Sequence, residues 1–244
     1  MALKKIVLKA ILPLIFLASC GDGPKGKEGA DAAPREAAQK DSVMIDTAQK
    51  KQPKEEEEEF VLTEDNAIDF FFDYQKDLKV DKVKITTRLG SFIIQLYDNV
   101  PYHKANFIYL TRKGYFNETQ FHRVVKDFII QGGNSDDSKT GRKRSEIGRY
   151  LLPPDTRKGH RHHRGTVSMP SSEKEKNPHM LASPYEFFIV VTDPGSYHLD
   201  GDFTPFGSVI EGMDVVDKIN NVKTGKGDWP YQNVYIQKAE VVEE

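Results

Sequence analysis

The sequence predicts a mainly β fold, either an antiparallel sandwich or a barrel. From residue 83 onward, short runs rich in Val, Ile, Phe and Thr alternate with turn residues, which is typical of strands. Only two stretches inside this region have helical spacing. Many short strands with few helices indicate a sandwich or barrel. This domain accounts for residues 81–244, and the segments before it need separate explanations.

Residues 1–19 are predicted to be a signal peptide. Three lysines (Lys4, Lys5 and Lys9) precede the apolar stretch 10–18. That stretch is too short to span a bilayer, which takes about 20 apolar residues. It ends in Leu17-Ala18-Ser19-Cys20, similar to the site at which bacterial lipoproteins are cleaved and lipidated.

Cys20 is the only cysteine in the chain, so it cannot form a disulfide within it. We expect it to carry acyl chains that anchor the protein to a membrane, on the extracytoplasmic side of a bacterial envelope. An ordinary signal peptide followed by an unrelated cysteine is the alternative.

Residues 20–59 are expected to be a disordered acidic tether. The segment has almost no large apolar residue, and it ends in five consecutive glutamates at 55–59. Such a composition cannot bury enough apolar surface to offset the entropy lost on ordering.

Residues 60–80 are expected to form a helical extension. The apolar residues 67, 68, 71, 72 and 78 fall near helical spacing, and Thr63 suits an N-cap position. We predict a helix over 64–78, with Phe70, Phe71, Phe72 and Tyr74 packed on the main domain, because a run of aromatic side chains is unfavourable in water.

The domain itself begins with a predicted hairpin of strands 83–87 and 92–97. A helix over 101–113 follows, with Pro101 in its first turn and Ala105, Ile108 and Tyr109 on its inner face. A second helix is predicted over 213–219. Further strands are expected at 121–125, 128–131, 165–169, 187–191, 206–210 and 234–242.

The stretch FHRVVKDFIIQGG, residues 121–133, resembles the signature of the cyclophilins, a family of peptidyl-prolyl cis-trans isomerases. Four further segments resemble the family in the same order: ANFIYLTRKGYFNETQFHRV, RGTVSMP, EFFIVVTD and HLDGDFTPFGSVIEGMDVVDKI. The similarity covers about residues 83–242. It implies a closed eight-stranded antiparallel barrel capped by two helices, to which the helix expected within residues 60–80 would be an addition. It also implies catalysis without cofactor or metal.

The resemblance assigns roles to individual residues of this chain. It implies that Arg123 is the catalytic arginine and that Gln131 orients it. It places four side chains in the proline pocket, namely Phe128, Ile129, Phe188 and Leu199. Arginine suits the chemistry because it stays charged and offers several N–H donors in a rigid fork. The alternatives are a surface ion pair for Arg123 and barrel core for Phe128 and Phe188.

Several positions depart from the family pattern on the opposite wall of the pocket. Ser171 stands where an asparagine is usual, Glu186 replaces a glutamine, and Phe203 replaces a histidine or tyrosine. We still expect all three to bind substrate. Glu186 is open to three interpretations: it occupies donors of Arg123, favours basic substrates, or faces solvent. His198 stands near a position often held by tryptophan, which predicts weak binding of cyclosporin-type inhibitors.

Two other features have ordinary explanations. Residues 139–164 hold nine Lys or Arg and two acids. We expect a solvated loop, and the alternative is a contact with anionic lipid, glycan or the acidic tether. His160, His162 and His163 lie on the same segment, but without carboxylate or cysteine at ligand spacing they do not predict a metal site. The net charge of -2 argues against a nucleic-acid binder.

The sequence therefore predicts a monomeric isomerase that assists the folding of extracytoplasmic proteins by rotating Xaa-Pro bonds. Its partners would be proline-containing polypeptides. The alternative is a chaperone or assembly module that binds proline segments with little turnover, a hypothesis motivated by Ser171, Glu186 and Phe203. Envelope scaffolding through the tether and the basic segment is a third possibility.

Overall fold

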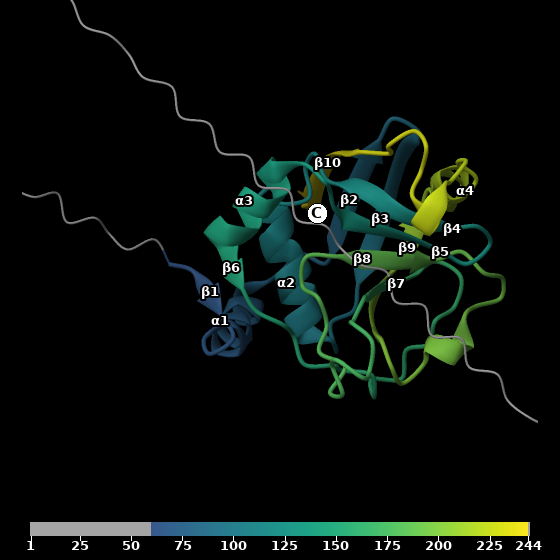
Figure 1. Ribbon diagram of the computed structural model, residues 1–244. Helices are drawn as coiled ribbons and strands as arrows, with labels where there is room; N and C mark the ends of the chain where they lie inside the picture. Colours follow the sequence, from purple (N-terminus) through teal and green to yellow (C-terminus); the bar gives the residue numbers. More distant parts are fainter. Residues whose placement is uncertain (1–59, 244) are drawn as a thin grey trace, which may run out of the picture. The chain divides into compact units, whose positions relative to one another are not determined.

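The computed structural model describes residues 60–243, drawn in colour in Figure 1. The predicted signal peptide 1–19, the predicted tether 20–59 and the predicted lipidation site Cys20 lie outside the described residues. Within 60–243, none of the helices has the length and apolar character needed to cross a bilayer.

One sheet of eight antiparallel strands forms the centre of the fold (Figure 1). In their order across the sheet, the strands are β10 (Ile236–Val242), β2 (Lys82–Thr87), β3 (Gly90–Leu96), β9 (Thr204–Glu211), β7 (Thr166–Met169), β8 (Phe187–Val190), β5 (Ile129–Asn134) and β4 (Gln120–Val125). Each of the strands predicted from sequence is present, with ends that coincide or differ by at most three residues. The mainly β class is therefore confirmed.

The sheet curls until its two edge strands, β10 and β4, approach each other. They meet at an isolated bridge between Gln120 and Tyr235. Three backbone hydrogen bonds accompany it: from Glu118 N–H to the Ile236 carbonyl at 2.8 Å, from Ile236 N–H to the Thr119 carbonyl at 2.7 Å, and from Phe121 N–H to the Val234 carbonyl at 2.9 Å. Within residues 60–243 these edges share no continuous ladder. The architecture is a curled, half-barrel sheet with a short contact between its edges, where the resemblance implied full closure.

Two helices lie where the sequence predicted them, α2 (Pro101–Arg112) and α4 (Met213–Asn220). A third, α3 (Ser138–Ile147), occupies part of the segment that was expected to be a solvated loop, so that prediction is wrong. The Asp137 carboxylate caps α3 by accepting from the Lys139 N–H at 2.9 Å. Only Thr140 and Ile147 of α3 are buried, and so sparse an apolar face gave no periodic signal.

The extension before the domain differs from the predicted helix over 64–78. Strand β1 (Leu62–Thr63) pairs in parallel with β6 (Gly148–Arg149). Helix α1 (Ala67–Tyr74) begins only after Asn66 and continues as the short 3₁₀ helix η1 (Gln75–Asp77). The predicted N-cap Thr63 is instead part of β1, and its N–H donates to the Asn66 side chain at 2.8 Å.

The aromatic run of α1 packs only in part. Phe71 is fully buried, with its ring 5.9 Å from that of Tyr109 and 5.7 Å from that of Tyr150. Phe72 remains 49% exposed, contrary to expectation.

The sheet carries apolar side chains on both faces. The main core lies on the inner face and includes Phe121, Val124, Ile130, Phe187 and Ile189. Their neighbours along β5 and β8 point the opposite way, because side chains alternate along a strand. A second cluster therefore lies on the outer face, formed by Ile129, Phe188 and Val190 with Val125, Phe128, Leu199 and Phe203 packed against it.

Candidate active site

A β-bulge in β4 brings Arg123 onto the outer face. Phe121 pairs with Gly132 and Arg123 pairs with Gln131, so His122 is an extra residue opposite a single step of β5. In a regular strand, Phe121 and Arg123 would share a face because they are two residues apart. The bulge lets Phe121 enter the main core while Arg123 faces outward beside Gln131.

Helix α4 stabilises the turn between β4 and β5. Asp127 has a positive φ of 58°, which reverses the chain after Lys126. The buried side chain of Asn220 accepts from the Asp127 N–H at 2.8 Å and donates to the Val125 carbonyl at 2.9 Å. The chain thus bends at residues 126 and 127, and α4 sets the geometry of the bend.

Strand β5 continues through the two glycines after Gln131 as far as Asn134. Gly133 has a φ of 94°, and a Cβ there would lie 2.4 Å from the Tyr185 carbonyl oxygen. Glycine is therefore needed at this position, because it lets the segment that contains Tyr185 approach β5 closely.

A cavity of about 220 Å³ opens on the outer face over this hairpin. Its lining consists of Arg123, Phe128, Ile129, Gln131, Pro170, Ser171, Phe188, Leu199 and Phe203. Apart from Cys20, nine residues are predicted for the site, and all of them except Glu186 belong to this set. The strand register explains the grouping, because Arg123 lies opposite Gln131 and Gln131 lies opposite Phe188 in one row across three strands.

The apolar part of the cavity is built from aromatic rings in contact. The rings of Phe188 and Phe203 meet edge to face at 5.6 Å. His198 stacks on Phe128 with ring centroids 5.5 Å apart. Phe188 is 3% exposed, yet it belongs to the outer cluster. Phe188 and Phe128, which packs against the same outer cluster, therefore line the cavity and also pack in a buried apolar cluster that is separate from the main core.

Arg123 has one ion-pair partner within residues 60–243, and it is not Glu186. Its Nε lies 3.5 Å from Asp228 Oδ2, with the two side chains 41% and 45% exposed. Asp228 ends the short 3₁₀ helix η3 (Lys226–Asp228) and has a positive φ of 60°.

Glu186 lies behind Gln131 and outside the cavity lining. Its carboxylate accepts from the Gln131 amide at 2.9 Å and from the Asn134 amide at 3.1 Å. His122 and Arg144 each approach it to 3.5 Å. Burial raises the pKa of Glu186, but the hydrogen bonds from His122 and Gln131 and the charge of Arg144 outweigh it and leave the pKa below its usual value.

The contacts of Glu186 exclude two of its three interpretations. Its side chain is only 16% exposed, and it touches Gln131 and not Arg123. It therefore neither occupies donors of Arg123 nor faces solvent. It fixes the Gln131 amide with its NH₂ toward the carboxylate, which leaves the amide oxygen as the free acceptor of that side chain.

Ser171 lies on the cavity rim with its hydroxyl already engaged. The hydroxyl donates to the Leu181 carbonyl at 3.0 Å and accepts from the Asn177 amide at 2.8 Å. Both partners belong to the segment that follows β7. Ser171 therefore contributes its position on the rim, while its polar atom holds that segment in place.

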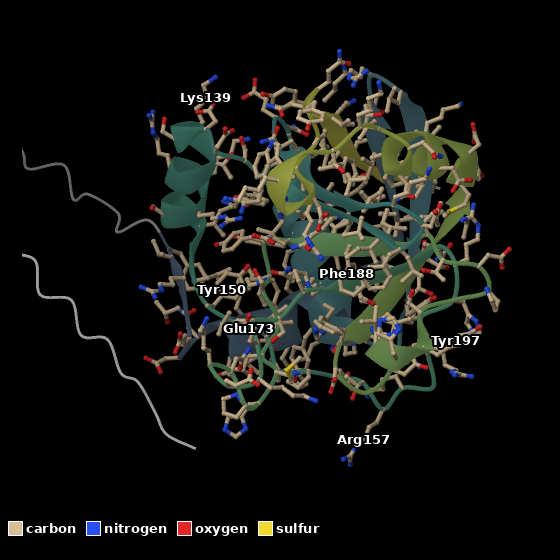
Figure 2. The ribbon with its side chains drawn as sticks, turned by 45° about the vertical axis from the view of Figure 1, so that its right-hand side comes forward. Lys139, Tyr150, Arg157, Glu173, Phe188 and Tyr197 are labelled. Atoms are coloured by element: carbon tan, nitrogen blue, oxygen red, sulfur yellow. The ribbon has the colours of Figure 1, made fainter. Side chains whose placement is uncertain are left out.

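The basic residues of 139–164 are largely used inside the domain. Six of the nine have an acceptor or anionic partner, namely Lys139, Lys143, Arg144, Lys158, Arg161 and Arg164. Lys143, for example, donates to the carbonyls of Gly114 and Asn117 at 3.2 and 2.6 Å. Lys139 and Arg157 lie at opposite ends of the view in Figure 2. The segment is thus a partnered part of the fold and not a solvated basic loop.

The three histidines of this segment make separate contacts. His160 stacks on Tyr97 with ring centroids 3.8 Å apart, and the Nδ1 of His163 meets the Tyr197 hydroxyl at 2.9 Å. His162 is fully buried. Among residues 60–243, no group of three or more His, Cys, Asp or Glu side chains is placed to hold a metal ion.

Comparison with known proteins gives one consistent family. Residues 82–241 match the family model described as cyclophilin type peptidyl-prolyl cis-trans isomerase/CLD. The chain is 38% identical over 164 residues to peptidyl-prolyl cis-trans isomerase-like 1 of Neurospora crassa, covering 66% of this chain and 94% of that relative.

Two further matches agree with this family. Peptidyl-prolyl cis-trans isomerase-like 2 of Rhizopus delemar is 33% identical over 172 residues, and the match spans 70% of this chain and only 30% of that longer protein. A crystal structure of a Cryptosporidium parvum cyclophilin type isomerase, in the presence of the dipeptide Ala-Pro, matches with a TM-score of 0.56 and 25% identity. That match covers 67% of this chain and 99% of the other.

Proposed function

The chain belongs to the cyclophilin-type peptidyl-prolyl cis-trans isomerase family, and from this premise we infer that the cavity around Arg123 is the site where it rotates Xaa-Pro bonds. The carrying observation is the row of Arg123, Gln131 and Phe188 across three neighbouring strands, which places a fixed cation beside an apolar pocket.

The reaction needs charge stabilisation and a grip on the proline ring. The Xaa-Pro amide resists rotation by about 18–20 kcal/mol because its C–N bond has partial double-bond character. At the top of the barrier the bond is twisted, the resonance is lost and the nitrogen lone pair becomes localised. A hydrogen-bond donor directed at that nitrogen stabilises the twisted state more than either planar state, and this difference accelerates the reaction.

Each part of the cavity has a role in this mechanism. The proline ring packs among Phe128, Ile129, Phe188, Leu199 and Phe203, and the terminal N–H groups of Arg123 donate to the substrate amide. Gln131 lies beside Arg123, with its orientation fixed by Glu186. Its free amide oxygen accepts either from Arg123 or from a substrate N–H. No bond to the protein forms, and no proton has to move.

The direct test is turnover of an Xaa-Pro tetrapeptide by the full chain and by Arg123→Ala and Arg123→Lys. We expect Arg123→Ala to lower kcat/KM by about 10²-fold or more, the scale seen when a donor to transition-state charge is removed. Lysine keeps the charge but not the planar fork, so it should recover only part of the rate. Full turnover by Arg123→Ala would refute the site. Peptide binding without turnover in the unaltered chain would instead favour a binding module.

We also propose that the protein is a monomer anchored by acyl chains on Cys20 in a bacterial envelope, where it acts on extracytoplasmic proteins as they fold. The support is the sequence Leu17-Ala18-Ser19-Cys20 after a short apolar stretch. Fractionation of Cys20→Ala against the unaltered chain tests the anchor, and the variant should leave the membrane fraction. Unchanged membrane association would contradict it, and sedimentation of the detergent-solubilised protein tests the monomer.

A further inference from the structure

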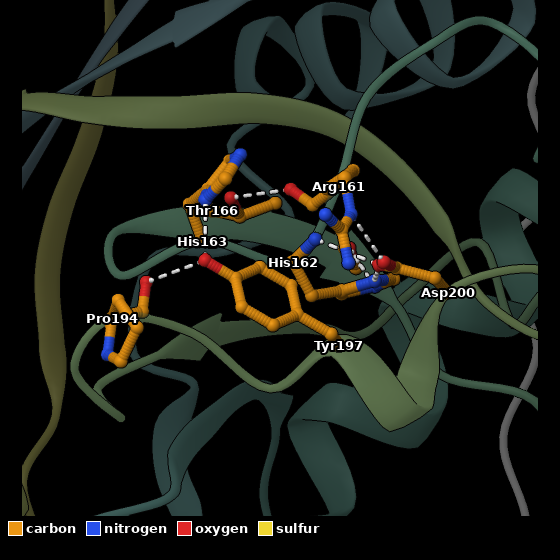
Figure 3. A network of polar contacts seen from close by, with 8 residues as sticks. Arg161, His162, His163, Thr166, Pro194, Tyr197 and Asp200 are labelled. Carbon is orange, nitrogen blue, oxygen red and sulfur yellow. Dashed lines mark hydrogen bonds and ion pairs between the residues drawn. The ribbon is translucent and has the colours of Figure 1, made fainter.

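His162 is a buried titratable side chain that the isomerase mechanism does not use. It lies just before β7 and is fully buried. Its backbone N–H and its Nδ1 both meet the same Asp200 oxygen, at 2.9 and 2.8 Å (Figure 3). Its Nε2 meets the Ser168 hydroxyl at 3.0 Å. The ring therefore spans from a central strand to the turn that follows η2 (Tyr197–Leu199).

The partners of His162 define its protonation. The Asp200 carboxylate only accepts, so Nδ1 carries the ring proton and Nε2 accepts from Ser168. Burial lowers the pKa of His162, and the hydrogen bond and charge of Asp200 oppose this only in part. The ring is thus neutral, with both nitrogens occupied and its orientation fixed.

The His162 ring packs against the lining of the cavity from outside it. It lies parallel to the Phe188 ring, with centroids 6.0 Å apart and planes inclined by 10°. Asp200 directly follows Leu199, and the His162 carbonyl accepts from the Ser196 N–H at 2.7 Å at the other end of the same turn. Phe188 and Leu199 both line the cavity, whereas His162 does not.

The order Ser168, His162 and Asp200 matches the connectivity of a hydrolytic triad, but its burial excludes that chemistry. Ser168 is 0% exposed and sits within β7, so its hydroxyl cannot reach a substrate carbonyl. The His162 side chain is therefore a rigid link between strand β7 and the pocket wall.

We propose that His162 is a positioning residue for the proline pocket, which sets the spacing between Leu199 and Phe188 through its Nδ1 bond to Asp200. This inference rests on the proposed function of the cavity. The walls hold the proline ring in the planar and twisted states alike, so loosening them weakens substrate binding more than the chemical step. The expected signature is a higher KM with little change in kcat.

Two substitutions separate the two contacts of the ring. An asparagine amide reaches about where Nδ1 lies, and a glutamine amide about where Nε2 lies. His162→Asn therefore keeps the bond to Asp200 and loses Ser168, and His162→Gln does the reverse. We expect His162→Gln to raise KM at least fivefold with kcat changed less than twofold, and His162→Asn to keep KM within twofold. Exchange NMR with an Xaa-Pro tetrapeptide gives KM and kcat separately.

The controls make every outcome decisive. A purely structural role predicts that both variants lose Tm and shift KM in parallel, and that result overturns the proposal. An unchanged KM in His162→Gln, or a larger shift in His162→Asn, also overturns it.

His160→Gln makes the same substitution two residues earlier and should leave KM unchanged. Should His162→Gln fail to fold, Asp200→Ala takes its place with the same expected KM. Arg123→Ala in the same assay tests the proposed function separately, because its failure appears in kcat whatever His162 does.

Discussion

At the scale of single residues, the site depends on side chains that hold Arg123 and Gln131 from outside the cavity. Asp228 pairs with the Nε end of Arg123, and Glu186 binds the amide of Gln131. A family signature identifies Arg123 and Gln131 because both lie within one short stretch of sequence. It says nothing of Asp228, which comes from a loop about a hundred residues later and has no motif of its own.

Removing the carboxylate of Asp228 should have a small, measurable effect on catalysis. The Arg123–Asp228 pair is about 40% exposed on both sides, and such a pair contributes at most about 1 kcal/mol. We expect Asp228→Asn to lower kcat/KM by up to fivefold, because the guanidinium becomes less ordered. Asparagine tolerates the positive φ, so the loop should keep its shape.

Lys218 and Asp214 form a more exposed pair on α4, away from the cavity lining, and supply the control. Asp214→Asn should leave kcat/KM unchanged. A rise in activity in Asp228→Asn would mean that the carboxylate restrains Arg123 and does not position it.

At the scale of elements, the sequence predicts what periodicity and turn chemistry encode. The hairpin of β2 and β3, helix α2 and helix α4 appear where expected because each has a regular apolar pattern and a clear boundary residue. Helix α3 was missed because it carries eight polar or charged residues and one glycine in SKTGRKRSEI, and its partners are carbonyls and carboxylates of other segments. Pairing of β1 with β6 was missed because two-residue strands carry no period.

Helix α4 should control the geometry of the catalytic hairpin through Asn220. Truncation to alanine leaves the Asp127 N–H and the Val125 carbonyl without this buried partner, at a cost of about 1–3 kcal/mol. We expect Asn220→Ala to lower Tm and to lower kcat/KM several-fold at a temperature where the variant is fully folded. The neighbouring Asn221→Ala removes only an exposed hydrogen bond to the Asp217 carbonyl, so it should lower Tm less and leave kcat/KM unchanged. Loss of Tm with full activity would show that the turn does not depend on α4.

The N-terminal extension should stabilise the domain without touching the cavity. Phe71 is fully buried against Tyr109 and Tyr150, so Phe71→Ala should cost about 3–5 kcal/mol in the free energy of unfolding. Phe72→Ala is the matched control, because its ring is half exposed, and it should cost much less. Urea unfolding measures both. Equal losses in the two variants would mean that α1 does not pack as described.

At the scale of the whole molecule, stability should fall on mild acidification because histidines are buried in neutral form. Burial lowers the pKa of His103 from 6.5 to about 3, and within residues 60–243 neither ring nitrogen has a hydrogen-bond partner. Between these two values the unfolded chain binds a proton that the folded chain does not. The contribution of neutral His103 to the free energy of unfolding is therefore fully present above about pH 6.5. It declines as the pH falls toward 3, by up to about 1.4 kcal/mol per pH unit.

His103→Leu should reduce the slope of the free energy of unfolding against pH by close to the amount that one proton contributes, since leucine does not titrate. The measurement is the free energy of unfolding in urea at pH 7, 6, 5 and 4 for the two proteins. His162, whose pKa burial also lowers, should account for part of the slope that remains. Parallel curves for the unaltered chain and His103→Leu would show that His103 is not the group that titrates.

The two-sided sheet also bears on how this protein can change over evolution. Its main core and its pocket cluster are separate sets of side chains on opposite faces, and adjacent residues such as Ile129 and Ile130 belong to different sets. Mutations at Leu199, Phe203 or Pro170 can alter which prolines are accepted while the packing that holds the fold together stays intact. A library randomised at these positions should thus yield mostly folded members, and substrate preference is the property on which selection can act.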